Sequence, residues 1–204
     1  MNDVLIESLK KVEFFDTFSS GRLQEISNIA TIESFSLGDK LLAPDTIPNK
    51  VSFVLDGEIR IIYQDKDEIR TLGKGKLGTP IGIISHLRSQ GCEYILASSD
   101  INVLTIPDTL FIDLYKENTD FKNLCEKTTY PSEVVSTISQ CKELNIINVL
   151  DFYLNNKNFI ELTDNIIDFK NDSIYIIGHN HLKNMSIGDI IDKNSFLINQ
   201  NSIF

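Results

Sequence analysis

Hydrophobic residues recur at every third or fourth position in two stretches near the start of the chain, residues 4–11 and 20–30. This spacing predicts two short amphipathic helices, and Ser20 is a candidate N-cap for the second. From Thr31 onward the pattern alternates, in short β-branched runs bounded by turn residues such as those of Gly73–Gly78. The predicted strands are Thr31–Leu37, Lys40–Ala43, Val51–Leu55, Glu58–Tyr63, Glu68–Leu72, Glu93–Ala97 and Val103–Ile106. Many short, evenly spaced strands indicate a sandwich, roll or barrel, not a parallel sheet with crossover helices.

The helical period returns after Pro107, and Pro131 with its small polar neighbours suits a joint between two units. Predicted helices cover residues 110–115, 121–127, 132–142 and 146–154, and predicted strands cover Asn165–Phe169, Ser173–Ile177 and His181–Met185. We therefore predict a mainly β fold with flanking helices, in two parts. Residues 1–128 form the first domain, and residues 129–204 form a helical linker plus a small, partial second β unit. The apolar run before Phe204 leads us to expect that the sequence is a piece of a larger protein.

Composition narrows the class of protein. Of 204 residues, 42% are hydrophobic and 24% are charged, which is ordinary for a chain with a packed core. The formal net charge of -10 disfavours binding to a phosphate backbone, so we expect no nucleic acid partner. The sequence contains neither an apolar stretch long enough to cross a bilayer nor a signal peptide, so we expect a cytoplasmic location without membrane insertion. Three cysteines without a C-x-x-C pair disfavour a disulfide framework and a zinc knuckle.

Four segments of the first domain carry a resemblance to a known family. They are Phe15–Phe18, Phe35–Leu41, Phe53–Ile61 and Val103–Pro107. In this order, with helices before and after the strands, they resemble the cyclic nucleotide-binding domain family across residues 1–128. The resemblance implies a β-roll of the jelly-roll type that regulates and does not catalyse, so we expect no enzyme activity. Glycine at position 57 suits such a roll, because the tight turn needs a positive φ angle.

The ligand cassette of that family departs from its pattern here. In the family, a segment similar to Phe-Gly-Glu-Leu-Ala, followed after a loop by Arg-Thr/Ser-Ala, holds the ring phosphate through N–H groups and the arginine, and its glutamate accepts from the ribose hydroxyl. This chain reads Ile-Gly-Ile-Ile-Ser at residues 81–85 and Gly-Cys-Glu at residues 91–93. The residues at the cassette position are Gly82, Ile83, Arg88, Gly91 and Cys92.

Gly82 keeps the family's glycine, but Ile83 stands at the glutamate position and Gly91 at the arginine position. Arg88 is near enough in sequence for a rearranged loop to deliver it, whereas nothing in the pattern replaces the carboxylate. Burying a phosphate without its charge partner is costly. We therefore expect a degenerate pocket that binds no cyclic nucleotide, and neither a cofactor nor a metal.

A narrower resemblance lies in Gly82–Ser98, through its Leu-Arg, Cys-Glu and Ala-Ser pairs. Their spacing is similar to that in the N-terminal, nucleotide-binding-like domains of cyanobacterial-type peptide or toxin exporters, which are long ABC transporters. This resemblance implies a regulatory or docking domain at the cytosolic face of the inner membrane. Its partners would be the other domains of the transporter.

Two other functions remain as alternatives. A transcription regulator of the catabolite-activator type needs a basic DNA-binding helix, yet residues 131–204 contain no arginine, five lysines and nine acidic residues. A cupin-like metalloenzyme would use His179 and His181 on one strand face, but the further histidine and glutamate ligands are missing. Two further motifs, a glycine-rich loop at Gly73–Thr79 and a Cys92–His86 nucleophile pair, are better interpreted as a roll corner and a structural cysteine.

Overall fold

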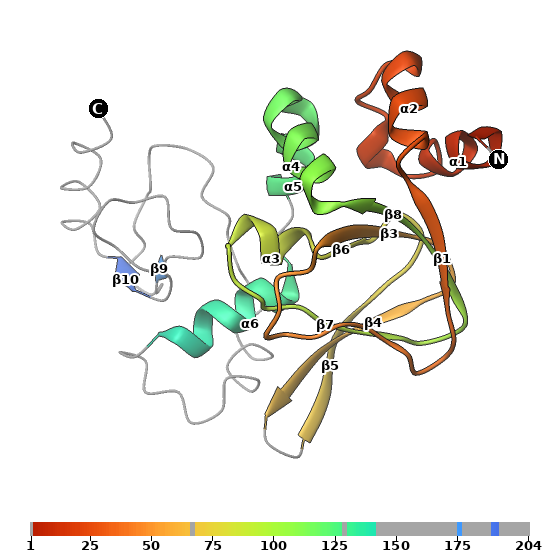
Figure 1. Ribbon diagram of the computed structural model, residues 1–204. Coiled ribbons are helices and arrows are strands. Elements are labelled where there is room, and N and C mark those ends of the chain that lie inside the picture. Colours follow the sequence, from red (N-terminus) through yellow and green to blue (C-terminus); the bar gives the residue numbers. More distant parts are fainter. Residues whose placement is uncertain (1, 66–67, 128–129, 142–174, 177–188, 192–204) are drawn as a thin grey trace, which may run out of the picture. The chain divides into compact units, whose positions relative to one another are not determined.

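The computed structural model describes residues 2–65, 68–127, 130–141, 175–176 and 189–191 (Figure 1). By its internal contacts the chain divides into two compact units, residues 1–128 and 129–204, and each is described by itself.

Whether the units are separate domains stays a prediction. Exposed linkers are cleaved first in limited proteolysis, so we expect a stable fragment of roughly 128 residues. Survival of both parts together at every protease concentration would contradict the predicted joint.

The first unit opens with a helical layer. It consists of α1 (Asn2–Leu9), the 3-10 helix η1 (Glu13–Phe15) and α2 (Ser20–Ser27). The cap of α2 is Ser19, whose side chain accepts a hydrogen bond from the N–H of Arg22 at 3.3 Å. The prediction of Ser20 as the cap is therefore wrong by one residue. Leu23 and Ile26 of α2 are buried, as the helical spacing predicts.

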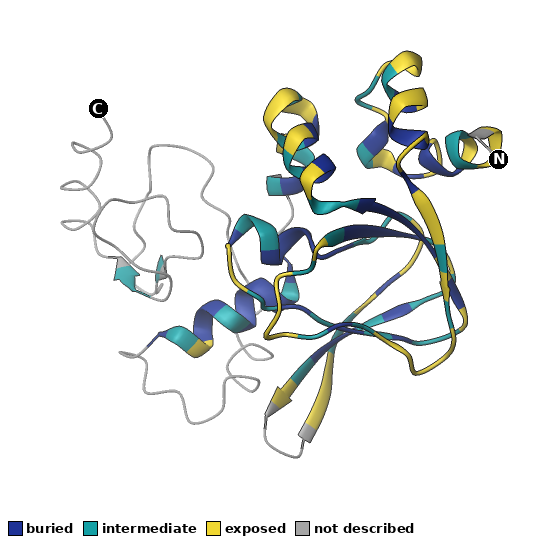
Figure 2. Ribbon diagram, viewed as in Figure 1, coloured by how far each residue is buried: buried dark blue, intermediate teal, exposed yellow. Residues whose placement is uncertain are grey.

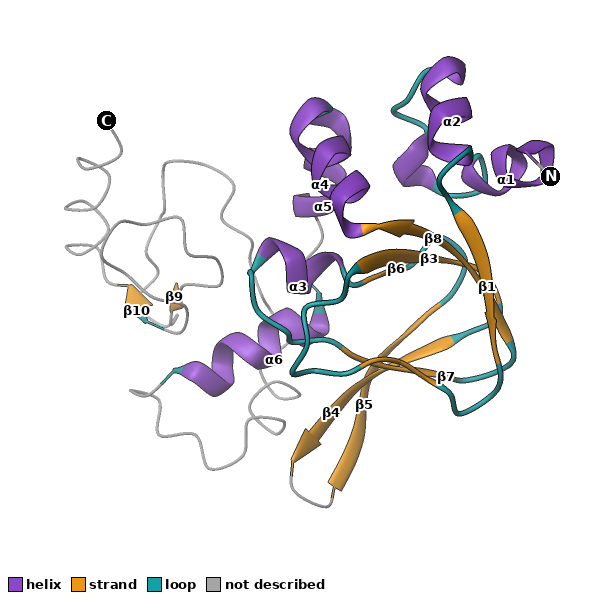
Figure 3. Ribbon diagram, in the orientation of Figure 1, coloured by secondary structure: helices purple, strands orange, loops and turns teal. Residues whose placement is uncertain are grey.

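Two antiparallel four-stranded sheets follow and face each other as a roll (Figure 3). The first sheet has the order β1 (Thr31–Phe35), β8 (Ile101–Pro107), β3 (Lys50–Asp56) and β6 (Pro80–Ile81). The second has the order β2 (Lys40–Leu42), β7 (Tyr94–Ala97), β4 (Ile59–Asp65) and β5 (Glu68–Gly75). Neighbours in each sheet come from distant parts of the chain: β1 pairs with β8, and β2 pairs with β7.

The structure differs from the sequence-based expectation at two places in the roll. The segment expected as a turn at Gly73–Gly78 begins as strand, because β5 continues to Gly75. A Cβ atom at Gly75 would lie 2.5 Å from Cγ2 of Thr79, so glycine permits a close approach within this strand. The short β6 and the helix α3 (Ile83–Leu87) were not predicted as such. Both are too short to produce a recognisable hydrophobic period.

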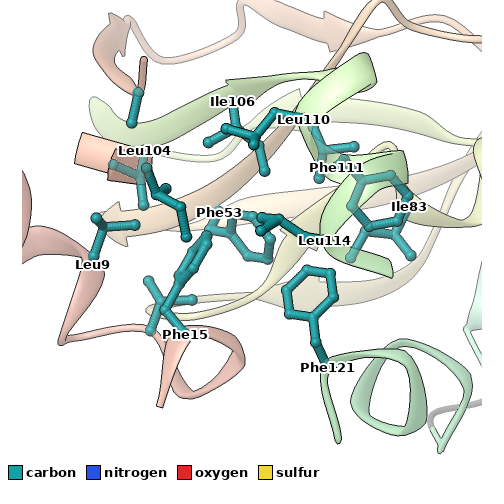
Figure 4. Packing of buried hydrophobic residues seen from close by; sticks show 14 of the residues in the cluster. Leu9, Phe15, Phe53, Ile83, Leu104, Ile106, Leu110, Phe111, Leu114 and Phe121 are labelled. Atoms are coloured by element: carbon teal, nitrogen blue, oxygen red, sulfur yellow. The ribbon is translucent and has the colours of Figure 1, made fainter. Parts of the chain in front are cut away.

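The core of the first unit consists of two clusters on opposite faces of the first sheet. One lies under the helices and is rich in phenylalanine (Figure 4); the other lies within the roll. β3 serves both, because Val51 and Phe53 belong to the first cluster and Val54 to the second. This explains why Val51–Val54 are all buried (Figure 2). The Phe53 ring lies 5.1 Å from that of Phe15, centroid to centroid.

Helices α4 (Asp108–Glu117) and α5 (Thr119–Lys127) close the first unit. Arg22 of α2 holds the carboxylate of Glu117 through two hydrogen bonds, Nε to Oε1 at 2.9 Å and Nη2 to Oε2 at 3.1 Å. The Asn118 side chain donates to the carbonyl of Thr17 at 3.2 Å. These contacts link the N-terminal helical layer to α4 across about half of the chain.

The second unit is described only in part. It contains α6 (Pro131–Gln140), with Pro131 in its first turn, and a two-stranded antiparallel sheet of β9 (Tyr175–Ile176) and β10 (Ile190–Ile191). The predicted helix at 146–154 and the predicted strands at 165–169 and 181–185 lie outside the described residues. Among the described helices, none has the length and apolar character needed to cross a membrane.

Candidate functional site

The site expected from the sequence lies where β6 leads into α3 (Figure 1). Gly82 is the N-cap of α3 and has a φ angle of +94°, a conformation that glycine adopts without the strain of a side chain. The first N–H groups of a helix have no partner within the helix. Two of them here, those of Gly82 and Ser85, donate to one side chain, which lies eleven residues downstream of Gly82.

Glu93 immediately precedes β7 in the chain, and its carboxylate lies at the start of α3. Its Oε1 accepts a hydrogen bond from the Gly82 N–H at 2.9 Å. Its Oε2 accepts from the N–H of Ser85 at 2.9 Å and from the Ser85 hydroxyl at 2.7 Å. Glu93 is only 4% exposed, and Ser85 is fully buried. A buried carboxylate is costly unless charge-assisted hydrogen bonds replace its water, so this triple contact ties the entry of β7 to α3.

The residues at the cassette position have different surroundings. Ile83 is 1% exposed and belongs to the core cluster beneath the helices, so this side chain serves packing. Arg88 is the C-cap of α3 and is 6% exposed. Cys92 is half-buried, with its Sγ 4.0 Å from the Ser85 hydroxyl oxygen. The structure therefore brings Gly82 and Cys92 close to Ser85, while Ile83 belongs to the hydrophobic core.

The segment between β2 and β3 covers both glycines of the site. A Cβ atom at Gly91 would lie 2.4 Å from the backbone nitrogen of Thr46, and one at Gly82 would lie 2.9 Å from Cγ of Pro48. Cβ atoms in proteins essentially never come within 3.0 Å of another group, and the neighbour of Gly91 is backbone, which cannot give way as a flexible side chain can. Position 91 therefore has no room for an arginine unless the backbone at 45–46 moves.

A cavity beside the site is too small for a nucleotide. Its volume is about 20 Å³, and Leu41, Pro48 and Ile81 are among the residues that line it. A volume of this size holds one water molecule, since roughly 10–15 Å³ suffices for one, whereas small-molecule pockets have volumes of about 300–1,000 Å³. The cavity is next to Gly82 in the chain, because Ile81 precedes it.

The other sequence motifs do not form a second site in the described part of the chain. Lys74 and Lys76 of the glycine-rich loop both form ion pairs with Glu58, at 2.6 and 3.7 Å, so neither is positioned as a phosphate ligand. The His86 ring packs against Phe111 with 5.7 Å between centroids, instead of forming a base for Cys92. Within the described ranges, no group of three His, Cys, Asp or Glu side chains could hold a metal. His179 and His181 lie outside those ranges.

The alternating pattern predicts Glu93 only as the first residue of a strand, not as a site residue. No replacement for the family's carboxylate is evident in the sequence, yet the structure places the Glu93 carboxylate against the cassette. One signal was available: Glu93 is the only acidic residue between positions 69 and 99 in a chain with 29 of them. An isolated acidic residue at the start of a strand, eleven residues after a turn glycine, can serve as an internal cap.

Comparisons with known proteins identify the fold. No protein-family model and no curated protein sequence matches the chain. Among solved structures, a regulatory subunit of a cAMP-independent protein kinase A from Trypanosoma brucei matches with a TM-score of 0.56 and 12% identity, over 62% of this chain and 47% of that one. The regulatory domain of Toxoplasma gondii PKA, co-crystallised with cAMP, matches with a TM-score of 0.53 and 13% identity, over 62% and 48% of the two chains.

A third match is a mutant of the cAMP-binding acyltransferase from Mycobacterium smegmatis, with a TM-score of 0.50 and 16% identity, over 60% of this chain and 39% of that one. The chain spans less than half the length of each of these proteins. At such identities the likeness defines the fold alone: β-sheets with flanking helices in the jelly-roll arrangement of cyclic nucleotide-binding domains. The predicted fold class is confirmed.

Proposed function

We propose that residues 1–128 act as a noncatalytic regulatory or docking domain in which Glu93 takes the position of a ligand phosphate. The observation that carries this proposal is the buried carboxylate that accepts three hydrogen bonds from Gly82 and Ser85. In the family that the sequence resembles, N–H groups of this cassette neutralise the ring phosphate. Here an internal anion already uses such donors.

A cyclic nucleotide would therefore compete with the protein's own side chain. There are two ways for the nucleotide's phosphate to enter the site, and both are costly. It could displace the Glu93 carboxylate, which would then lose its buried hydrogen bonds, or it could lie beside that carboxylate and repel it. It would also lack the family's two charged partners, because Ile83 and Gly91 stand in their positions. The loss of such charge-assisted contacts costs several kcal/mol, roughly a thousandfold in affinity.

Calorimetric titration with cAMP and with cGMP tests this proposal. We expect no binding heat above that of dilution, because the donors of the cassette are occupied and the charged partners are absent. A dissociation constant in the micromolar range would contradict the proposal. In that case Arg88→Ala should abolish the binding if the cassette holds the phosphate, and leave it intact if the nucleotide binds elsewhere.

A regulatory role without cyclic nucleotide has support from the fold comparison. The regulatory subunit from Trypanosoma brucei that shares the fold is described as part of a cAMP-independent kinase. The fold is thus compatible with regulation that does not depend on cAMP. A roll whose cassette is filled from within still offers a rigid surface to other domains.

We further propose that this domain belongs to the cytosolic part of a peptide or toxin exporter of the ABC transporter class, where its partners are the transporter's other domains. The support is the sequence resemblance of Gly82–Ser98 together with the net charge of -10, which suits pairing with basic cytosolic loops. Reading the coding sequence past Phe204 tests it. Membrane spans and a Walker-type loop are expected; a stop codon there, with no exporter gene nearby, would contradict it.

A further inference from the structure

His86 forms a contact between the cassette helix α3 and the helix α4. It lies in the last turn of α3, and its ring centroid is 5.7 Å from that of Phe111 in α4, with 43° between the ring planes. Phe111 is 2% exposed and also contacts the rings of Tyr115 and Phe121. The imidazole therefore joins the site segment to the aromatic cluster beneath the helices.

The surroundings of His86 favour its neutral form. Its Nε2 atom is buried and has no hydrogen-bond partner among the described residues. Burial lowers the pKa of His86 below its usual value, while the Asp108 carboxylate at the start of α4 and the Pro48 carbonyl act in the opposite direction. The other charged groups nearby in the chain are Arg88, the C-cap of α3, and Glu93, whose carboxylate accepts hydrogen bonds from Gly82 and Ser85.

We propose that protonation of His86 loosens the contact between α3 and α4, so that this domain responds to acidification of its surroundings. A protonated imidazole carries an N–H at both ring nitrogens. The Pro48 carbonyl is one acceptor beside the ring, whereas the buried Nε2 atom forms no hydrogen bond with a described residue. The ring gains an acceptor by turning toward water, because His86 is only half-buried. That movement removes its packing on Phe111.

The direction of the pH effect follows from the lowered pKa. The folded state binds this proton less readily than the unfolded state. The contribution of His86 to stability is therefore fully present at pH values above about 6.5, the pKa of a histidine in the unfolded chain. It is lost progressively as the pH falls from there towards the lower pKa of His86 in the folded state. The inference does not depend on the proposed function, because the His86–Phe111 contact exists whether or not the cassette can bind a nucleotide.

Amide hydrogen exchange of the full chain, corrected for the intrinsic pH dependence of exchange, tests this proposal. Between about pH 7.5 and about pH 5.5 we expect the protection of α3 and α4 to fall roughly tenfold, the effect of one unsatisfied buried donor. In His86→Phe, which keeps a ring against Phe111 but cannot titrate, this fall should be absent. The matched control is the double variant His179→Gln/His181→Gln, which removes the other two histidines of the chain and should behave as wild type.

A second variant keeps the test decisive if His86→Phe does not fold. Asp108→Asn removes the carboxylate that favours the imidazolium, so the loss of protection should move to lower pH. NMR titration of the His86 ring in the wild type should give the same midpoint as the exchange data. Equal protection of α4 at both pH values in the wild type, or an equal fall in wild type and His86→Phe, would overturn the proposal.

Discussion

Replacing Glu93 with alanine is expected to lower the free energy of unfolding by about 3–5 kcal/mol, since three hydrogen bonds to a charged group are lost together. The Gly82 N–H, the Ser85 N–H and the Ser85 hydroxyl would all lose their acceptor. These groups are buried, so bulk water cannot replace the carboxylate without local opening of α3. Urea unfolding followed by circular dichroism measures the change.

Two variants separate the effect of the Glu93 hydrogen bonds on stability from the effect of removing any negative charge. Glu7→Ala removes a carboxylate from an exposed ion pair with Lys10, and it should change stability by less than about 1 kcal/mol. Glu93→Gln keeps the shape and one acceptor oxygen, so its cost should lie between those of the two alanine variants. A loss below about 1 kcal/mol for Glu93→Ala would mean that the buried carboxylate does not hold α3 in place.

Replacing Gly57 with alanine is expected to cost a similar amount, about 3–5 kcal/mol, from strain and overpacking combined. Gly57 has a φ angle of +87° in the tight turn between β3 and β4. An added Cβ would lie 2.5 Å from the Asp100 carbonyl oxygen and 2.6 Å from Cγ2 of Ile101. The side chain would therefore push apart two loops that meet at this end of the roll.

Gly38→Ala is the matched control for this prediction. Gly38 has nearly the same φ angle, +90°, but nothing lies within 4 Å of a Cβ placed there. It should therefore show the backbone strain alone, about 1–2 kcal/mol. Thermal or urea unfolding of both variants measures the difference. If both variants lose the same stability, the close approach around Gly57 has no energetic role.

The roll could be predicted from the sequence because its strands are bounded by residues with definite turn chemistry. Gly57 marks the turn between β3 and β4, and Pro107 marks the change from β8 to α4. Burial of Phe53 could also be predicted, because it lies in a run of apolar residues. That the strand is buried on both faces follows from this run, and not from the alternating pattern that identifies half-buried strands.

The site was less accessible to sequence reasoning, because it depends on contacts across the chain. The Glu93 carboxylate reaches back to Gly82, and Gly91 packs against the backbone of Thr46, 45 positions earlier in the sequence. A comparison with the family's cassette detects the missing glutamate and arginine, yet it assigns no role to a new acidic residue nearby. Spatial pairing of this kind becomes visible only once the strands are in register.

The most direct test of whether Glu93 fills the phosphate position is the exchange rate of two amide protons, those of Gly82 and Ser85. It is measured by NMR in nucleotide-free protein and again after addition of excess cAMP. Because both N–H groups donate to the buried carboxylate, we predict that both are protected without nucleotide and that cAMP changes neither. Rapid exchange at both amides in the nucleotide-free protein, with protection appearing only after cAMP is added, would show that the cassette is open and accepts the nucleotide.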